Sequence, residues 1–192
     1  MSIYCNNECL NCIHYFDDEK EIVNKIQFKK GEFWKLKPKE YEIVFILKGS
    51  LNVSFEQYSN ETIEKDDMIL IPSDRDFYIE AMEDSELFLM QIPASVLTYQ
   101  CTTIKLFNYQ TPDTDTTLNY LTINKNIAIF LSTLEIYIEE NIKCFSLHEC
   151  KIRELFFLLE EGYKKTELYK FFHLALKNNS SFSNLANHNK TK

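Results

Sequence analysis

The chain has 192 residues, and its 29 acidic and 21 basic side chains give it a net charge of −8. Its three glycines are too few and too scattered for a P-loop, a dinucleotide-binding fingerprint or the glycine-flanked serine of an α/β-hydrolase. The acidic balance also argues against a surface that grips the phosphate backbone of DNA.

The apolar content of 45% is sufficient for the core of one domain. No apolar run is long enough for a membrane helix, and residues 1–20 lack the pattern of a secretory signal. Six cysteines are too few for a disulfide-stabilised fold, which favours a reducing compartment. We therefore expect a cytoplasmic protein without membrane contact.

Residues 1–20 are expected to form an N-terminal arm, and this arm holds a cluster of candidate zinc ligands. The cluster consists of Cys5, Cys9, Cys12 and His14. Four ligands within ten residues leave no second pair on another loop, and Cys12 and His14 stand very close together for one ion. We therefore favour ordinary reduced cysteines and expect neither a metal nor another cofactor.

The segment 21–93 has the pattern of a β-domain. Residues 42–47 (EIVFIL) are continuously apolar after Glu42, which predicts a strand covered on both faces, whereas residues 50–56 alternate, which predicts one buried face. Further strands are predicted at 68–71, ending before Pro72, and at 77–81 and 87–92, with turns at 48–50 and 59–60. Many short strands at this spacing indicate a sandwich or a barrel.

Beyond a connecting segment at 94–123, the apolar period becomes helical, and it stays so through residues 124–176. Asn124 is a candidate N-cap for the first helix. Ser146 and Glu149 form a capping box for the second, and Gly162 stands where a helix-ending glycine is expected. A shorter third helix is predicted at about 166–176, and 177–192 is expected to be a linker or tail.

Aromatic side chains in the β-domain are candidates for the lining of a ligand cavity, because such cavities combine apolar walls with a few polar groups. The candidate ligand-binding residues are Trp34, Tyr41, Glu42, Phe77 and Tyr78. An ordinary place in the barrel core is the alternative for each of them. Lys35, Lys37 and Lys39 are interpreted as a solvated strand edge, with a lining for an anionic ligand as the alternative.

The stretch from Glu42 to Met82 resembles a cupin barrel, through Glu42 with the following Gly49 and through Pro72 after a short buried strand. The positions of the cupin metal-binding histidines are occupied by Lys35, Lys37 and Phe77. The resemblance therefore implies a cupin barrel without its metal site.

Four later segments resemble the effector region of AraC/XylS-type transcription regulators, most closely the versions common in Bacteroidetes. They are 121–126 (LTINKN), 144–148 (CFSLH), 151–159 (KIRELFFLL) and 167–172 (ELYKFF). In that family a cupin barrel senses a small molecule, a helical hairpin dimerises and a helix-turn-helix half binds DNA. The 192 residues lack that last half, so the resemblance implies an isolated sensor half or a short paralogue that pairs with full-length regulators.

We therefore expect an α+β fold: a cupin-like antiparallel β-barrel (jelly roll), a helical hairpin and a short third helix. The expected function is a small-molecule-sensing and dimerisation domain of an AraC-like regulator, without enzymatic activity and without its own DNA contacts. The expected homodimer interface consists of Leu131, Leu134, Ile138, Leu155 and Leu158. The rival hypothesis is a metal-independent isomerase or lyase that uses Glu42 with Tyr41 or Tyr78 as an acid–base pair.

Overall fold

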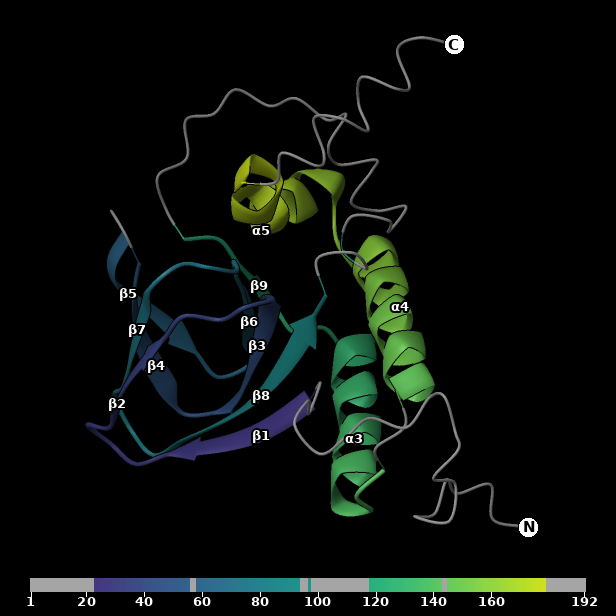
Figure 1. Ribbon diagram of the computed structural model, residues 1–192, viewed down its shortest axis with the longest axis horizontal. Helices are drawn as coiled ribbons and strands as arrows, with labels where there is room; N and C mark the ends of the chain where they lie inside the picture. The colour runs from purple at the N-terminus through teal and green to yellow at the C-terminus, as the bar shows by residue number, and fades with distance from the viewer. Residues whose placement is uncertain (1–22, 56–57, 94–96, 98–117, 143–144, 179–192) are drawn as a thin grey trace, which may run out of the picture.

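The computed structural model describes residues 23–55, 58–93, 97, 118–142 and 145–178. Two antiparallel sheets face each other and form the barrel (Figure 1). The larger sheet has the order β1 (Val23–Phe28), β8 (Ser85–Ile92), β3 (Tyr41–Lys48), β6 (Asp67–Ile71), β9 (Tyr120–Thr122). The smaller sheet has the order β2 (Phe33–Leu36), β7 (Phe77–Ala81), β4 (Ser50–Phe55), β5 (Tyr58–Glu64).

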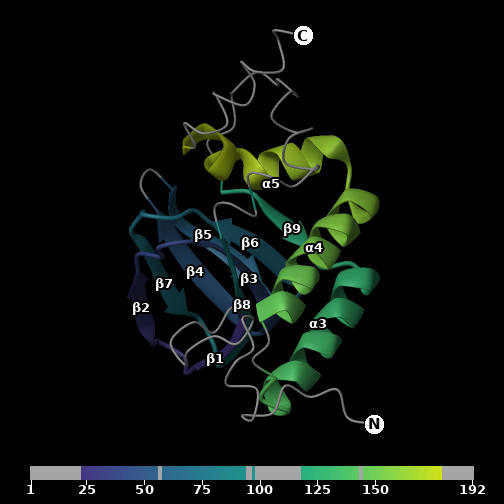
Figure 2. The ribbon, with the colours of Figure 1, turned by 45° about the vertical axis from the view of Figure 1, so that its right-hand side comes forward.

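Three helices follow the strands: α3 (Lys125–Glu139), α4 (Phe145–Gly162) and α5 (Lys165–Asn178). The antiparallel pair α3 and α4 lies beside the larger sheet, and α5 lies across one end of the barrel, in contact with β6 and β9 (Figures 1 and 2). The predicted fold class, an antiparallel jelly-roll barrel followed by a helical hairpin and a third helix, is confirmed. Within the described residues, no helix is both long and apolar enough to span a membrane.

The larger sheet separates two hydrophobic cores, because side chains alternate between the faces of a strand. On β3, Ile43 and Phe45 point to the helices, whereas Val44 and Ile46 point between the two sheets. We call the cluster of Val44, Ile46 and the other buried side chains between the two sheets the barrel interior. The cluster of Ile43, Phe45 and the inner faces of the helices is the helix-facing core. This arrangement explains why residues 43–47 are all apolar, as expected for a strand that is covered on both faces.

The helix boundaries follow local chemistry. Asn124 caps α3, as predicted: its Oδ1 accepts hydrogen bonds from the Asn126 and Ile127 amides at 2.9 and 3.0 Å. Gly162 ends α4, also as predicted, but without the left-handed backbone of a glycine cap. A Cβ at Gly162 would meet Asn124 Nδ2, so a larger residue there would displace the side chain that caps α3.

The predicted turn at residues 59–60 is wrong, since both residues lie within β5. Asn60 has a φ of 56°, and its amide donates to Ser54 Oγ at 3.2 Å, next to a register shift between β4 and β5. Asn tolerates this left-handed conformation, so turn chemistry here marks a local irregularity of the hairpin. Likewise, β9 falls within the predicted connecting segment and pairs with β6, which adds a fifth strand to the larger sheet.

Candidate functional site

The barrel interior contains one carboxylate, Glu42, near the start of β3. Its strand neighbours are Ile71 on β6 and Gln91 on β8. Only 5% of Glu42 is exposed. Its Oε1 accepts a hydrogen bond from Gln91 Nε2 at 3.3 Å, whereas its buried Oε2 has no hydrogen-bond partner in the described part of the chain. A buried polar atom without a partner carries a desolvation cost of about 1–3 kcal/mol, which a ligand can relieve.

Several strands place apolar side chains at the same end of the barrel. Leu36 at the end of β2 lies opposite Phe77 at the start of β7, and the Phe77 ring stacks on Phe55 with centroids 4.4 Å apart. The loops on either side are joined there by a 2.8 Å hydrogen bond from the Asp74 amide to the Pro38 carbonyl oxygen. Glu42 therefore stands in an apolar environment that the surrounding strands hold in place.

The helix α5 contributes to both cores. Phe171 and Phe172 belong to the helix-facing core, whereas Leu174 packs against the side chains of the barrel interior. Helix α5 contacts β6 and β9 and lies across one end of the barrel, so it borders both the larger sheet and the barrel interior (Figures 1 and 2).

The apolar surroundings change the protonation of Glu42. Burial raises the pKa of the carboxyl from 4.5 to about 7, and the hydrogen bond from Gln91 offsets only part of this rise. At neutral pH the group therefore exchanges between charged and neutral forms. A ligand that donates a hydrogen bond to Oε2 favours the charged form.

Three of the five predicted ligand-binding residues face or border the barrel interior. Glu42 and Phe77 point into the barrel interior, and Trp34 packs at its edge, with its ring 5.7 Å from Phe28. Tyr41 lies in the helix-facing core, since it precedes Glu42 on the same strand and must point the other way. Tyr78 lies on the outer face of the smaller sheet, where its ring stacks on Phe33.

The lysines that precede Glu42 lie outside the barrel. Lys35 Nζ is 5.2 Å from the centre of the Tyr78 ring and 3.7 Å from Asp76 Oδ2. Lys37 and Lys39 are exposed as well. This placement fits the interpretation as a solvated edge, and the lysines do not line the barrel interior.

The five predicted interface residues are only partly accessible. Leu131, Leu134 and Leu155 are buried in the helix-facing core of the single chain, so they offer no surface to a partner. Ile138 and Leu158 are half-buried against the same core. For the three leucines the prediction is wrong, because the helix-facing core covers the stripe that the helical period identified, whereas an interface at Ile138 and Leu158 stays a prediction. The exposed apolar side chains of the hairpin are Ile129, Ile136 and Phe157.

Sequence reasoning missed Gln91 and the helix residue Leu174. The only local signal for Gln91 is one amide within the apolar run of residues 87–92, and its pairing with Glu42 depends on the register of β3 and β8. The described residues contain no group of three metal-ligand side chains. Cys5, Cys9, Cys12 and His14 lie outside the described residues.

Comparison with known proteins shows likeness to solved structures over about a third of this chain. No family model matches the sequence, and no curated protein is significantly similar to it. Among solved structures, a cupin-superfamily protein of Desulfitobacterium hafniense is 14% identical, with a TM-score of 0.35 over 37% of this chain and 65% of that one. An RmlC-like cupin protein of Methanocaldococcus jannaschii, which has a double-stranded β-helix fold, is 20% identical, with a TM-score of 0.35 over 37% and 68%.

The EutQ protein of Clostridium difficile is 13% identical, with a TM-score of 0.34 over 37% of this chain and 55% of that protein. The chain thus spans less than two thirds of the length of some of these proteins. The strand order of the two facing antiparallel sheets in the chain itself is that of a jelly-roll barrel, and three helices follow it.

Proposed function

We propose that the chain is a small-molecule-sensing and dimerisation domain of an AraC-like transcription regulator. Glu42 carries this proposal: a buried carboxylate oxygen without a partner, in an otherwise apolar barrel interior, is a site prepared for a hydrogen-bond donor. The expected ligand is a small molecule with an apolar body and one polar group directed at Glu42. DNA contacts belong to a helix-turn-helix region outside these residues, as in the family that the sequence resembles.

The connection between the barrel and the helices supports a sensing role. Strand β3 presents Glu42 to the interior and its neighbours Tyr41 and Ile43 to the helices. Helix α5 joins the two cores through Leu174. A ligand that shifts β3 or displaces Leu174 therefore alters the packing of the helices, and packed cores respond to such shifts by repacking.

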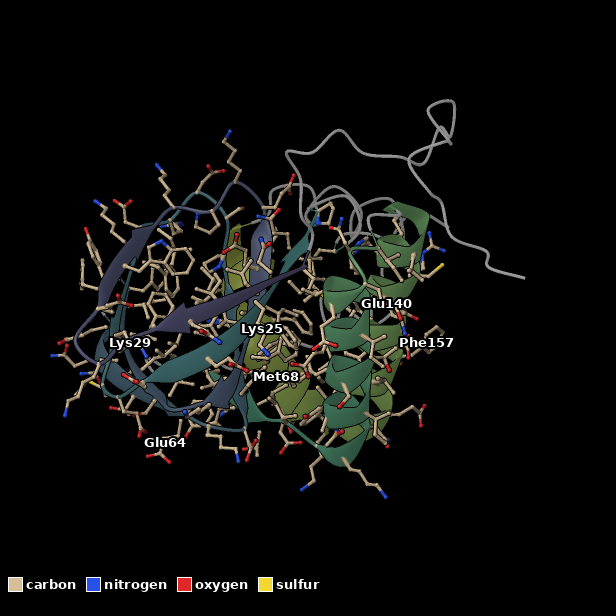
Figure 3. All side chains as sticks on the ribbon, turned by 90° about the horizontal axis from the view of Figure 1, so that it is seen from below. Lys25, Lys29, Glu64, Met68, Glu140 and Phe157 are labelled. Atoms are coloured by element: carbon tan, nitrogen blue, oxygen red, sulfur yellow. The ribbon has the colours of Figure 1, made fainter. Side chains whose placement is uncertain are left out.

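The exposed side of the helical hairpin supports the dimerisation role. Ile129 and Ile136 are seven residues apart on α3 and therefore share one face, with exposed fractions of 57% and 51%. Phe157 on α4 is 70% exposed and lies on the side of the helices away from the strands (Figure 3). Covering a Phe or Ile side chain contributes about 1.5–3 kcal/mol, so these three favour a second copy of the chain or a full-length relative as partner.

A second candidate function is a metal-independent isomerase or lyase. The observation in its favour is the pKa of Glu42, about 7, which suits a general acid or base at neutral pH. Neither Tyr41 nor Tyr78 faces Glu42, so an enzyme would need a different second group from the one the sequence suggested. Turnover of a bound compound, followed by nuclear magnetic resonance, would support this alternative over a sensor that releases its ligand unchanged.

Trp34 provides the experiment, because it is the single tryptophan and packs against the barrel interior. A metabolite library is screened by Trp34 fluorescence, and hits are retested on Ile71→Phe, which enlarges a side chain beside Glu42. Leu70→Phe is the matched control, since Leu70 is the neighbouring residue and points to the helix-facing core. We expect binding to be lost in the first variant and retained in the second; equal binding by both would contradict the proposal.

A further inference from the structure

The carboxylate of Glu42 has no countercharge among its described neighbours. Its strand partners, Ile71 and Gln91, are uncharged, and the side chains of the barrel interior around it are apolar. The buried basic residues of the described chain lie on helices instead: Lys151 pairs with Glu154 on α4 at 2.7 Å, and His173 lies beside the Tyr169 ring on α5. The described residues therefore supply neither a positive charge nor a hydrogen-bond donor to Oε2.

The missing countercharge and the missing hydrogen-bond donor at Glu42 argue against three classes of ligand. An anionic ligand would stand against a carboxylate in an apolar environment, where like charges repel strongly. A purely apolar ligand would leave Oε2 without a partner and would add to the desolvation of the group. A metal ion needs a set of ligand side chains, and the described residues contain no such set.

The side chain of Gln91 further restricts the class of ligand that can bind beside Glu42. Its amide nitrogen already serves Glu42 Oε1, so the group that binds Oε2 must be a donor from the ligand. The amide of Gln91 also carries an oxygen, which is an acceptor. Two acceptors on adjacent side chains suit a group with at least two N–H donors, and a positive charge on that group makes its hydrogen bonds shorter and stronger.

We propose that the barrel binds a small organic cation, a primary ammonium or an amidinium on a short apolar body, through Glu42 Oε2 and the amide oxygen of Gln91. This inference rests on the proposed sensing function and specifies its ligand class. The apolar body of the cation packs against the side chains around Phe77. Leu174 of α5 packs against the same interior cluster, so the helix borders the cluster that would receive the cation.

The test is isothermal titration calorimetry on the full chain with n-butylammonium, n-butanol and butyrate, which share one apolar body and differ in their polar group. We expect n-butylammonium to bind at least tenfold more tightly than the other two, and Glu42→Gln to lose at least tenfold of that affinity. Glu80→Gln is the matched control, because it removes the same charge from an exposed position on β7. Circular dichroism confirms that each variant is folded.

The pH dependence gives a second measurement on the unchanged protein. The affinity for n-butylammonium should rise between about pH 5.5 and pH 8, as Glu42 becomes ionised, while that for n-butanol should not. Equal affinities for the three compounds, equal binding by Glu42→Gln, or no binding of n-butylammonium would overturn the inference. If n-butylammonium fails but another class of compound alters Trp34 fluorescence, the cation proposal is wrong and the proposed sensing function is retained. If no compound alters it, both the cation proposal and the sensing function are wrong.

Discussion

The Tyr163 hydroxyl, just beyond the end of α4, donates a 2.6 Å hydrogen bond to the carbonyl oxygen of Thr122, at the end of β9. The same oxygen of Tyr163 accepts a hydrogen bond from the Asn124 amide at 3.2 Å. Asn124 in turn caps α3. One half-buried tyrosine therefore fixes three elements relative to one another: the end of the barrel sheet, the start of α3 and the end of α4.

The first prediction concerns this tyrosine. Tyr163→Phe keeps the ring and removes both hydrogen bonds, so the free energy of unfolding should fall by about 1–3 kcal/mol. Urea denaturation followed by circular dichroism measures the change. Tyr120→Phe, on an exposed side chain of β9, is the control and should change stability by less than about 0.5 kcal/mol. Equal effects of the two substitutions would show that the Tyr163 contacts do not hold the helices.

Gly162 gives the second prediction. Gly162→Ala should lower the free energy of unfolding, although alanine is normally the better helix residue, because the new Cβ would meet Asn124 Nδ2. The penalty should shrink in an Asn124→Ser background, since serine also caps helices but has a shorter side chain. The comparison is a double-mutant cycle in urea. Additive effects of the two substitutions would mean that the contact between the helix ends is not the cause.

The third prediction concerns pH and the free chain. A carboxyl whose pKa is higher in the folded state holds its proton more tightly there, so its contribution to stability is present at low pH and is lost as pH rises. For Glu42 this contribution is lost between about pH 4.5 and pH 7, the pKa values of the carboxyl in the unfolded and folded chain. Glu42→Gln should therefore match the parent at about pH 4.5 and exceed it at pH 8 by about 3 kcal/mol. A stability difference that does not change with pH would contradict the assigned environment of Glu42.

The fourth prediction concerns the helical surface. Phe157→Asp should give a folded monomer, because it places a charge on the exposed apolar face without touching the core. Leu134→Asp should instead unfold the chain, since it puts a charge into the helix-facing core. Light scattering and circular dichroism distinguish these outcomes. Phe33→Asp is the control, because Phe33 on β2 is a similarly exposed phenylalanine outside the helices. A monomeric parent protein, or a Phe157→Asp variant that remains dimeric, would contradict a dimer interface on this helical surface.

The sequence predicted the barrel and the helices because their patterns are local. The alternation of residues 50–55 and the cap at Asn124 appear in the structure as predicted. What could not be predicted depends on contacts between distant residues. The helical period predicted that Leu134 lies on the apolar face of its helix. Only the tertiary structure shows that this face packs on the larger sheet of the same chain and not on a second copy.

The candidate site shows the same limit. Glu42 was singled out in the sequence by the cupin-like pattern that it forms with Gly49 and as a possible acid–base partner of a tyrosine. Tyr41 and Tyr78 were grouped with it by composition, although strand geometry places one in the helix-facing core and the other on the outer face. Gln91 is 49 residues away, and only the register of β3 and β8 brings it to Glu42.

The most direct test of the account is to locate the bound ligand through isoleucine methyl groups. Ile69, Ile71 and Ile79 lie in the barrel interior, whereas Ile43, Ile127 and Ile152 lie in the helix-facing core. Methyl nuclear magnetic resonance spectra of the full chain are compared with and without the compound that changes Trp34 fluorescence. We expect the largest shifts at Ile71 and its interior neighbours. Shifts confined to the helix-facing core or to exposed Ile129 and Ile136 would contradict ligand binding in the barrel interior.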